Sequence, residues 1–204
     1  MTVRNEALME FVWIRHGMTK GNREKRYIGG RTDEPLCEEG RRLLRERVQA
    51  GLYPQVERVY VSPMIRCIET ADIIYPYVEK QIVPDFRECD FGLFENKNYK
   101  EMANLPEYQA WVDGNGKDAF PQGEHPEAFN RRSLDALLAL ADIGELAGRS
   151  AFVVHGGTIM AVCSQLDAAK KEYYDYHVDN GCGYICRAEK TAAGLVFREC
   201  REFG

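Results

Sequence analysis

Runs of β-branched and aromatic residues mark the expected strands of this chain. They cover Phe11 to Ile14, Val56 to Val61 and Ala151 to Val154. Such runs are typical of strands that other elements cover on both faces. The pair at 82–83, limited by Pro84, predicts one more short strand. A terminal strand pair is expected at 183–187 and 195–198, with its turn at 192–194.

Helical periodicity fills the segments between these runs. Apolar positions from Glu38 to Ala50 share one side among charged residues, which indicates a surface helix. Ser is preferred at a helix N-cap and Pro at the first position, so the next helix is expected to begin at Ser62-Pro63. A long helix is expected from about 127 to 144 or 148, and another after Val154. This alternation predicts an α/β fold of three layers, α/β/α, in which helices cover both faces of a mostly parallel sheet.

The segment from Asp85 to about Pro126 lacks this periodicity. Aromatic residues there alternate with Glu88, Asp90 and Glu95. Aromatic and polar residues mixed on irregular structure suit a lid or pocket wall, so we expect a small helical or irregular insertion over the active site. The length of 204 residues otherwise suits one domain, covering 1–204.

The composition limits the partners and the compartment. The 27 Lys and Arg against 32 Asp and Glu give a net charge of −5, which favours neither nucleic acid nor an anionic membrane as a partner. The sequence contains no apolar run of membrane-spanning length and no signal-peptide pattern, so a cytoplasmic location is expected. Seven cysteines without a CxxC pair argue against a disulfide framework and a zinc site. We expect free thiols, with Cys182 and Cys186 on one face of a strand as packing residues.

One segment of this acidic chain is basic. From Arg15 to Arg31 there are six Lys and Arg residues and a single acid, Glu24. Such a segment can steer anions toward a site, and a solvated charged loop explains the same run equally well.

Two expected strands end in the same way, with Arg-His-Gly at 15–17 and His-Gly-Gly at 155–157. Arg66 lies in the first turns of the helix that follows the strand at 56–61. Ligands of open α/β sheets bind outside the carboxyl ends of the strands, so Arg15, His16, Arg66 and His155 should converge on one crevice. Two arginine forks and two imidazoles fit a phosphate best, because one neutral His can act as a nucleophile while the other donates to a phosphate oxygen. The chain has no GxxxxGK[ST], HExxH or GxSxG motif that would support another enzyme class.

Four ordered stretches carry a resemblance to a known family. RHGMTKGN, SPMIRCIETA, RECDFGLFEN and VVHGGT resemble the motifs of the histidine phosphatase superfamily, also called the phosphoglycerate mutase-like fold. The likeness covers about residues 9 to 160 and is greatest to the small phosphatase branch, which includes α-ribazole phosphatases. It implies a phosphomonoesterase that acts on a small phosphorylated metabolite through a phosphohistidine.

The resemblance also implies roles for individual residues. His16 would be the nucleophile and Glu88 the proton donor, with Arg15, Arg66 and His155 binding the phosphoryl group during catalysis. The residues expected to contact the substrate are Arg15, Thr19, Asn22, Gly29, Arg66, His155 and Gly156. No metal and no other cofactor is implied. The expected partner is a small-molecule phosphate monoester, bound by a monomer or homodimer.

Four positions depart from the family pattern. Cys37 stands where Ser or Thr usually caps the following helix, so a weaker cap is expected there. Phe94 stands where Trp is usual and Asn96 where Gly is usual. His125 replaces a Ser that follows Gly-Glu in the small phosphatases, which leaves the substrate contacts at that position open.

Other functions compete with the phosphatase. A cofactor-dependent phosphoglycerate mutase shares the four motifs but usually has a longer insertion. A regulator that binds phosphate without turnover would not need the full set of two His, two Arg and Glu88. A metal enzyme would use His16, His155 and Glu88 as ligands instead.

Overall fold

The computed structural model describes residues 9–114, 116–144, 146 and 148–204. Within these ranges the strands form one six-stranded sheet in the order β3-β2-β4-β1-β5-β6. The strands are β1 Met9–Arg15, β2 Arg58–Val61, β3 Lys80–Ile82, β4 Gly148–Val154, β5 Gly183–Thr191 and β6 Gly194–Phe203. The first four in the sheet run parallel, and β5 and β6 continue it antiparallel. The prediction of a mostly parallel sheet is confirmed.

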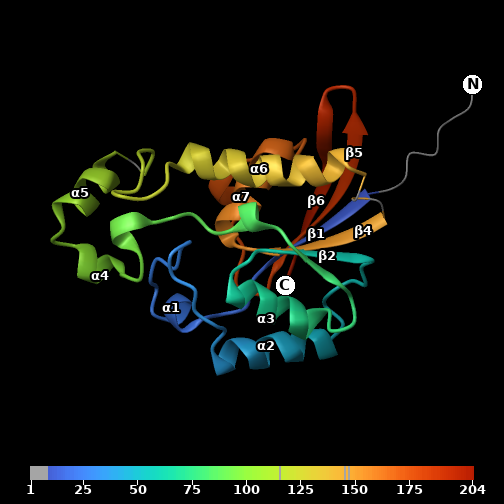
Figure 1. Cartoon of the computed structure of the whole chain (residues 1–204), viewed down its shortest axis with the longest axis horizontal. Coiled ribbons are helices and arrows are strands. Elements are labelled where there is room, and N and C mark those ends of the chain that lie inside the picture. The colour runs from blue at the N-terminus through green and yellow to red at the C-terminus, as the bar shows by residue number, and fades with distance from the viewer. Residues whose placement is uncertain (1–8, 115, 145, 147) are drawn as a thin grey trace, which may run out of the picture.

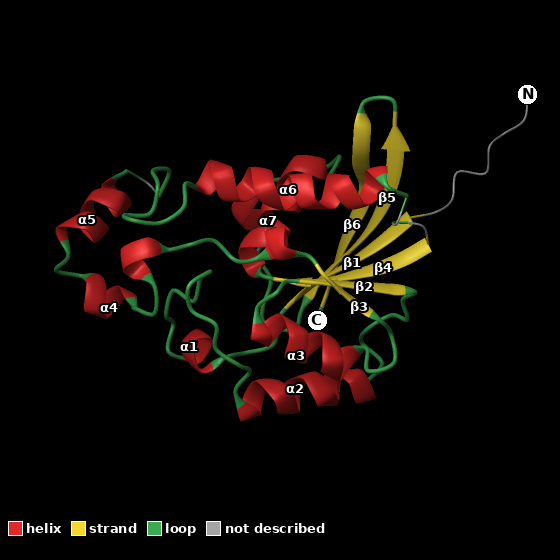
Figure 2. Ribbon diagram, in the orientation of Figure 1, coloured by secondary structure: helices red, strands yellow, loops and turns green. Residues whose placement is uncertain are grey.

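Helices cover both faces of the sheet, which confirms the three-layer prediction (Figures 1 and 2). α2 and α3 lie on one face, and α6 and α7 lie on the other. The α-helices are α1 Lys20–Arg23, α2 Glu38–Gln49, α3 Ile65–Ile74, α4 Tyr99–Met102, α5 Pro106–Asp113, α6 Pro126–Asp142 and α7 Gly156–Leu166. Short 3-10 helices cover Pro84–Phe86, Gly92–Phe94 and Tyr173–Tyr176.

The apolar run of β1 is continuous because both of its faces are buried. Phe11 and Trp13 pack into the core under α6 and α7, whereas Val12 and Ile14 pack into the core under α2 and α3. All four side chains are fully buried. Since side chains alternate along a strand, one run of apolar residues supplies both cores.

The helix expected at Ser62 begins later, at Ile65, and that prediction is wrong. The Ser62 hydroxyl contacts the His155 ring, and a carboxylate oxygen of Asp33 accepts the Ile65 N–H at 2.8 Å. A capping group from another segment therefore takes the place of the local one.

The segment from 85 to 126 contains α4 and α5, which lie to one side of the sheet (Figure 1). Its aromatic residues form a small core of their own, in which Phe94 and Phe120 pack with Met102 and with Phe129 of α6. Asn96, which stands where Gly is usual, has a φ of 56°. That is the left-handed region, which Asn tolerates better than most residues with a side chain.

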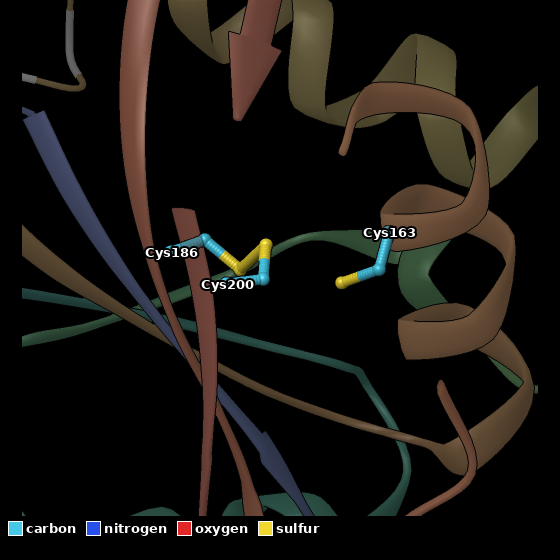
Figure 3. A group of neighbouring side chains, drawn as sticks. All are labelled: Cys163, Cys186 and Cys200. Carbon is cyan, nitrogen blue, oxygen red and sulfur yellow. A yellow bond between two sulfur atoms is a disulfide. The ribbon is translucent and has the colours of Figure 1, made fainter. Parts of the chain in front are cut away.

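The expectation that all cysteines are free thiols is wrong for two of them. Cys186 of β5 and Cys200 of β6 form a disulfide, and Cys163 of α7 faces them (Figure 3). The two lie directly opposite each other in the β5–β6 pairing, although they are 14 positions apart in the sequence. The other five cysteines are free.

No helix in the described ranges is long and apolar enough to cross a membrane. The expectation about a signal peptide concerns the first residues of the sequence, and residues 1–8 lie outside the described ranges.

Candidate active site

A cavity of about 340 Å³ opens where β1 and β4 end. Segments far apart in the sequence supply its wall. The lining residues are Arg15, His16, Asn22, Lys25, Arg26, Tyr27, Ile28, Glu88, Phe91, Gly156, Gly157, Met160, His177 and Asn180. Five of the nine site residues expected from the sequence are therefore at the wall of this cavity.

His16 has one ring nitrogen fixed by the backbone. Its Nδ1 lies 2.8 Å from the carbonyl oxygen of Gly17. A carbonyl can only accept, so Nδ1 carries the proton and Nε2 keeps its lone pair. Burial, and next the positive charges of Arg66 and Arg15, hold the His16 pKa well below its usual value. His16 is therefore neutral near pH 7, in the form that a nucleophile requires.

The two arginines have donors left over for a ligand. Arg66 is fully buried, and its terminal nitrogens donate to the carbonyl oxygens of Thr32 at 2.9 Å and Gly29 at 3.2 Å. Arg15 donates from Nη1 to the Val178 carbonyl at 2.7 Å. The buried Nε–H of each arginine has no hydrogen-bond partner among the described residues. Buried donors are nearly always satisfied, so these two mark a place for acceptor oxygens.

His155 lies behind His16, with ring centroids 5.3 Å apart. Its Nε2 is 2.7 Å from the Ser62 hydroxyl, which holds the ring in place. Burial, and next the charge of Arg66, keep the His155 pKa well below its usual value. A neutral His155 retains one N–H, which can donate to a phosphate oxygen.

Glu88 lies at the wall of the same cavity as His16. Its Oε1 accepts the Cys89 N–H at 2.9 Å, and burial raises the Glu88 pKa despite that bond and the charges of Arg66 and Arg15. A Cβ added at Gly157 would come within 2.8 Å of Glu88 Oε1, so glycine there lets the carboxyl approach the start of α7. A raised pKa favours the protonated form, which is the form of a general acid.

Arg132 of α6 holds the Glu88 segment in place, a contact that the sequence did not reveal. It donates to the carbonyl oxygens of Asp85 and Arg87 at 2.7 Å and of Glu88 at 3.2 Å. It also makes a paired salt bridge to Glu124, with both N–O distances at 2.8 Å. Because this one side chain donates to five acceptor atoms of four residues, it fixes the backbone that carries the Glu88 carboxyl.

Asn22 belongs to a small amide network beside His16. Thr19 and Asn22 form a capping box at α1, which explains why Thr19 does not line the cavity. Asn180 donates to the carbonyl oxygen of His16 at 3.0 Å and to Asn22 Oδ1 at 3.1 Å. The Asn-Gly turn before β5 was the available sequence signal for Asn180.

Four expected site residues do not reach the cavity wall in the structure: Thr19, Gly29, Arg66 and His155. Arg66 and His155 are both fully buried next to His16: the His155 ring contacts the His16 ring, and the charge of Arg66 helps to lower the His16 pKa. Gly29 acts through its carbonyl, which holds Arg66, and a Cβ there would meet Glu95 Oε1 at 2.3 Å. His125 does not line the cavity either, because it caps α6 by accepting the Glu127 N–H at 3.2 Å.

The ligand atoms of His16, His155 and Glu88 do not form a compact set. Among the described residues, one group of three or more His, Cys, Asp or Glu has its ligand atoms within 4.8 Å of one another, namely Cys163, Cys186 and Cys200. Two of these are joined in the disulfide. The geometry of the strand ends therefore does not favour the metal-ligand alternative.

A neutral imidazole beside unpaired guanidinium donors is the arrangement of an enzyme that handles phosphoryl groups. The chain belongs to the histidine phosphatase superfamily (branch 1), whose sequence profile it matches over residues 11–199. It is thus an enzyme of the phosphoric monoester hydrolase type.

Relatives with different names match most of the chain. A Hydrogenobacter thermophilus protein provisionally named phosphoserine phosphatase 2 is 30% identical over 190 residues, which cover 90% of this chain and 92% of that protein. A Cronobacter sakazakii protein named as a phosphoglycerate mutase, GpmB, is 28% identical over 165 residues, covering 78% and 75%.

Solved structures share the fold. The α-ribazole phosphatase of Shigella flexneri superposes with a TM-score of 0.77 at 22% identity, covering 93% of this chain and 95% of that one. A phosphoglycerate mutase of Thermus thermophilus gives a TM-score of 0.68 at 24% identity, covering 96% and 99%.

Proposed function

We propose that this protein is a metal-independent phosphomonoesterase that forms a phosphohistidine on His16 and acts on a small phosphorylated metabolite. Two observations carry the proposal: the buried Nε–H donors of Arg15 and Arg66 have no partner in the described part of the chain, and both arginine charges act on a His16 whose Nδ1 is bound to a carbonyl oxygen. A phosphoryl group bound there would accept from both donors and face the lone pair of the nucleophile.

The proposed reaction has two steps. His16 Nε2 forms a bond to phosphorus while the bond from phosphorus to the leaving oxygen breaks, and Glu88 gives its proton to that oxygen. Water then attacks the phosphohistidine, Glu88 takes a proton from the water, and the bond from His16 to phosphorus breaks. Arg15, Arg66 and His155 stabilise the charge on the three other phosphoryl oxygens in both steps. Asn22, Gly29, Gly156 and Thr19 shape or support the pocket.

The proposal names the substrate only by its class. The proposed partner is a small phosphate monoester. The proposed enzyme is a monomer or homodimer and acts in the cytoplasm. α-Ribazole phosphate is one substrate to test, since a structure of that fold is named for this activity. A reducing cytoplasm would tend to open the Cys186–Cys200 disulfide.

Phosphate release from monoesters should not depend on added metal. Arg15, Arg66 and His155 supply the positive charge and donors that a divalent ion supplies elsewhere. We expect the purified enzyme to keep its full rate on p-nitrophenyl phosphate after treatment with a chelator, as measured by phosphate release. Loss of activity that a divalent ion restores would contradict this part of the proposal.

The phosphoglycerate mutase remains the second candidate because relatives carry that name. A mutase must keep the phosphohistidine from water, whereas a phosphatase must admit water. We expect efficient release of phosphate from general monoesters and no useful isomerisation of 3-phosphoglycerate, followed by NMR with and without bisphosphoglycerate. Rapid isomerisation stimulated by the bisphosphate would assign the mutase instead.

A further inference from the structure

The basic segment from Arg15 to Arg31 is largely neutralised in the fold. Lys20 pairs with Glu24 and Arg23 with Glu39 at 3.8 and 3.9 Å. The other paired cations are Arg26, which bonds Glu24 and Glu101, and Arg31, which bonds Asp90. Apart from Arg15, whose buried Nε–H has no hydrogen-bond partner among the described residues, this leaves Lys25. Its ammonium has no ion pair and no hydrogen bond among the described residues.

Lys25 lies at the wall of the same cavity as His16. Among the described lining residues, Glu88 is the only one with a carboxyl group, and its pKa is raised. A phosphoryl dianion would balance the charges of Arg15 and Arg66. The cavity would then still hold one uncompensated positive charge, that of Lys25, with the imidazole of His177 in the same wall.

The backbone at Lys25 is held firmly and does not itself call for a lysine. Its φ is 55°, a region where Gly or Asn is less strained. Two backbone hydrogen bonds fix the turn. The Lys25 N–H donates to the carbonyl oxygen of Asn22 at 3.0 Å, and the Arg26 N–H donates to that of Gly21 at 2.9 Å. The paired bonds from Arg26 to Glu101, at 2.8 and 2.9 Å, tie this turn to α4. The rigid turn fixes the point at which the Lys25 side chain leaves the backbone, at the cavity wall.

We propose that Lys25 is a specificity-determining residue that binds a second anionic group on the leaving group of the substrate. The inference rests on the proposed function and narrows its substrate class to phosphomonoesters that also carry a carboxylate or another phosphate. α-Ribazole phosphate, whose leaving group has no anionic group, would make no use of this contact.

The test compares three substrates that share a three-carbon skeleton: glycerol 3-phosphate, 3-phosphoglycerate and glycerol 1,3-bisphosphate. The Lys25→Met variant should lower kcat/KM for 3-phosphoglycerate or for glycerol 1,3-bisphosphate by about five- to tenfold more than for glycerol 3-phosphate. This is the size of effect expected for a partly exposed charge contact. Preferential loss on 3-phosphoglycerate identifies a carboxylate, and preferential loss on the bisphosphate identifies a phosphate. Lys25→Arg should retain most of the preference.

Lys20→Met is the matched control, because it removes the same charge from the same basic segment at a residue that does not line the cavity. It should change the three substrates by similar small factors. Equal losses on all three substrates for Lys25→Met, or losses that match those of Lys20→Met, would overturn the inference.

A binding measurement separates this inference from the proposed function. Calorimetry on His16→Ala, with and without Lys25→Met, gives the affinity ratios of 3-phosphoglycerate and of glycerol 1,3-bisphosphate to glycerol 3-phosphate. If the wild-type enzyme hydrolyses no monoester, the proposed function fails. If Lys25→Met lowers either affinity ratio, the anion contact is still supported. If Lys25→Met leaves both affinity ratios unchanged, the contact is rejected.

Discussion

Replacing His16 with alanine is expected to lower kcat by at least about 10⁴-fold on every phosphate monoester. The loss is large because the variant has no group to form the covalent intermediate, and losses of this kind in nucleophile variants reach about 10⁶. Neutral His16, with Nε2 free, is prepared for attack without a separate base. Single-turnover and steady-state kinetics on p-nitrophenyl phosphate measure the effect.

His125→Ala is the matched control for His16→Ala. It removes an imidazole that caps α6 and does not line the cavity. It should keep most of the activity, with a loss of stability of about 1 kcal/mol from the missing cap. Thermal unfolding of both variants shows whether either has lost its fold. Substantial turnover by a folded His16→Ala enzyme would reject His16 as the nucleophile.

Trapping the intermediate tests the same assignment chemically. With labelled substrate, the wild-type protein should carry a phosphoryl group that is lost in acid and retained in base, as a phosphohistidine is. His16→Ala should carry none. A label that survived acid and was lost in base would indicate an acyl phosphate and a carboxylate nucleophile.

Glu88→Gln is expected to slow alkyl phosphates by about 10² to 10⁴ in kcat/KM and p-nitrophenyl phosphate much less. An alkoxide is a poor leaving group without a proton, whereas p-nitrophenolate leaves readily. Because kcat/KM reports the first step alone, slow hydrolysis of the phosphohistidine does not obscure the comparison. Equal losses on both substrates would remove Glu88 from the acid role.

The pH dependence gives a second measurement of Glu88. Burial raises its pKa, so the carboxyl is protonated below that raised pKa and its help is lost as pH rises through it. The ratio of wild-type to Glu88→Gln kcat/KM on an alkyl phosphate should therefore fall with rising pH, and the ionisation of the substrate cancels in this ratio. The His16 pKa is held well below its usual value, so its protonation should limit the rate only in more acidic solution. A ratio that stayed constant with pH would indicate a role for Glu88 other than proton donation.

Other carboxylates near Glu88 serve as comparisons. Glu95 accepts from the Gly29 N–H at 3.2 Å, and Glu124 pairs with Arg132, and neither lines the cavity. Their Gln variants should affect both substrates alike, because they would disturb the positions of Arg66 and of the Glu88 segment and would not remove a proton donor.

The sequence by itself determined the local features and their order. β1 and β4 read as apolar runs because both faces are buried, and their ends place His16 and His155 at one edge of any parallel sheet. Arg66 followed from its place in the first turn of the helix after β2. Periodicity and chain order are enough for these conclusions, because they depend on burial and on the direction of each strand.

Only the tertiary structure decided which side chains meet. The sequence around Ser62 predicts a helix cap, but in the structure its hydroxyl forms a hydrogen bond with the ring of His155, 93 positions away. Nothing in the sequence relates Cys186 to Cys200, but the β5–β6 hairpin places them opposite each other, where they form a disulfide. In the basic segment, acids from α2 and from the 85–126 region neutralise some cations and leave Lys25 unpaired within the described residues. Such pairings depend on distances between segments far apart in the chain, and a local pattern of apolar and polar residues carries no information about those distances.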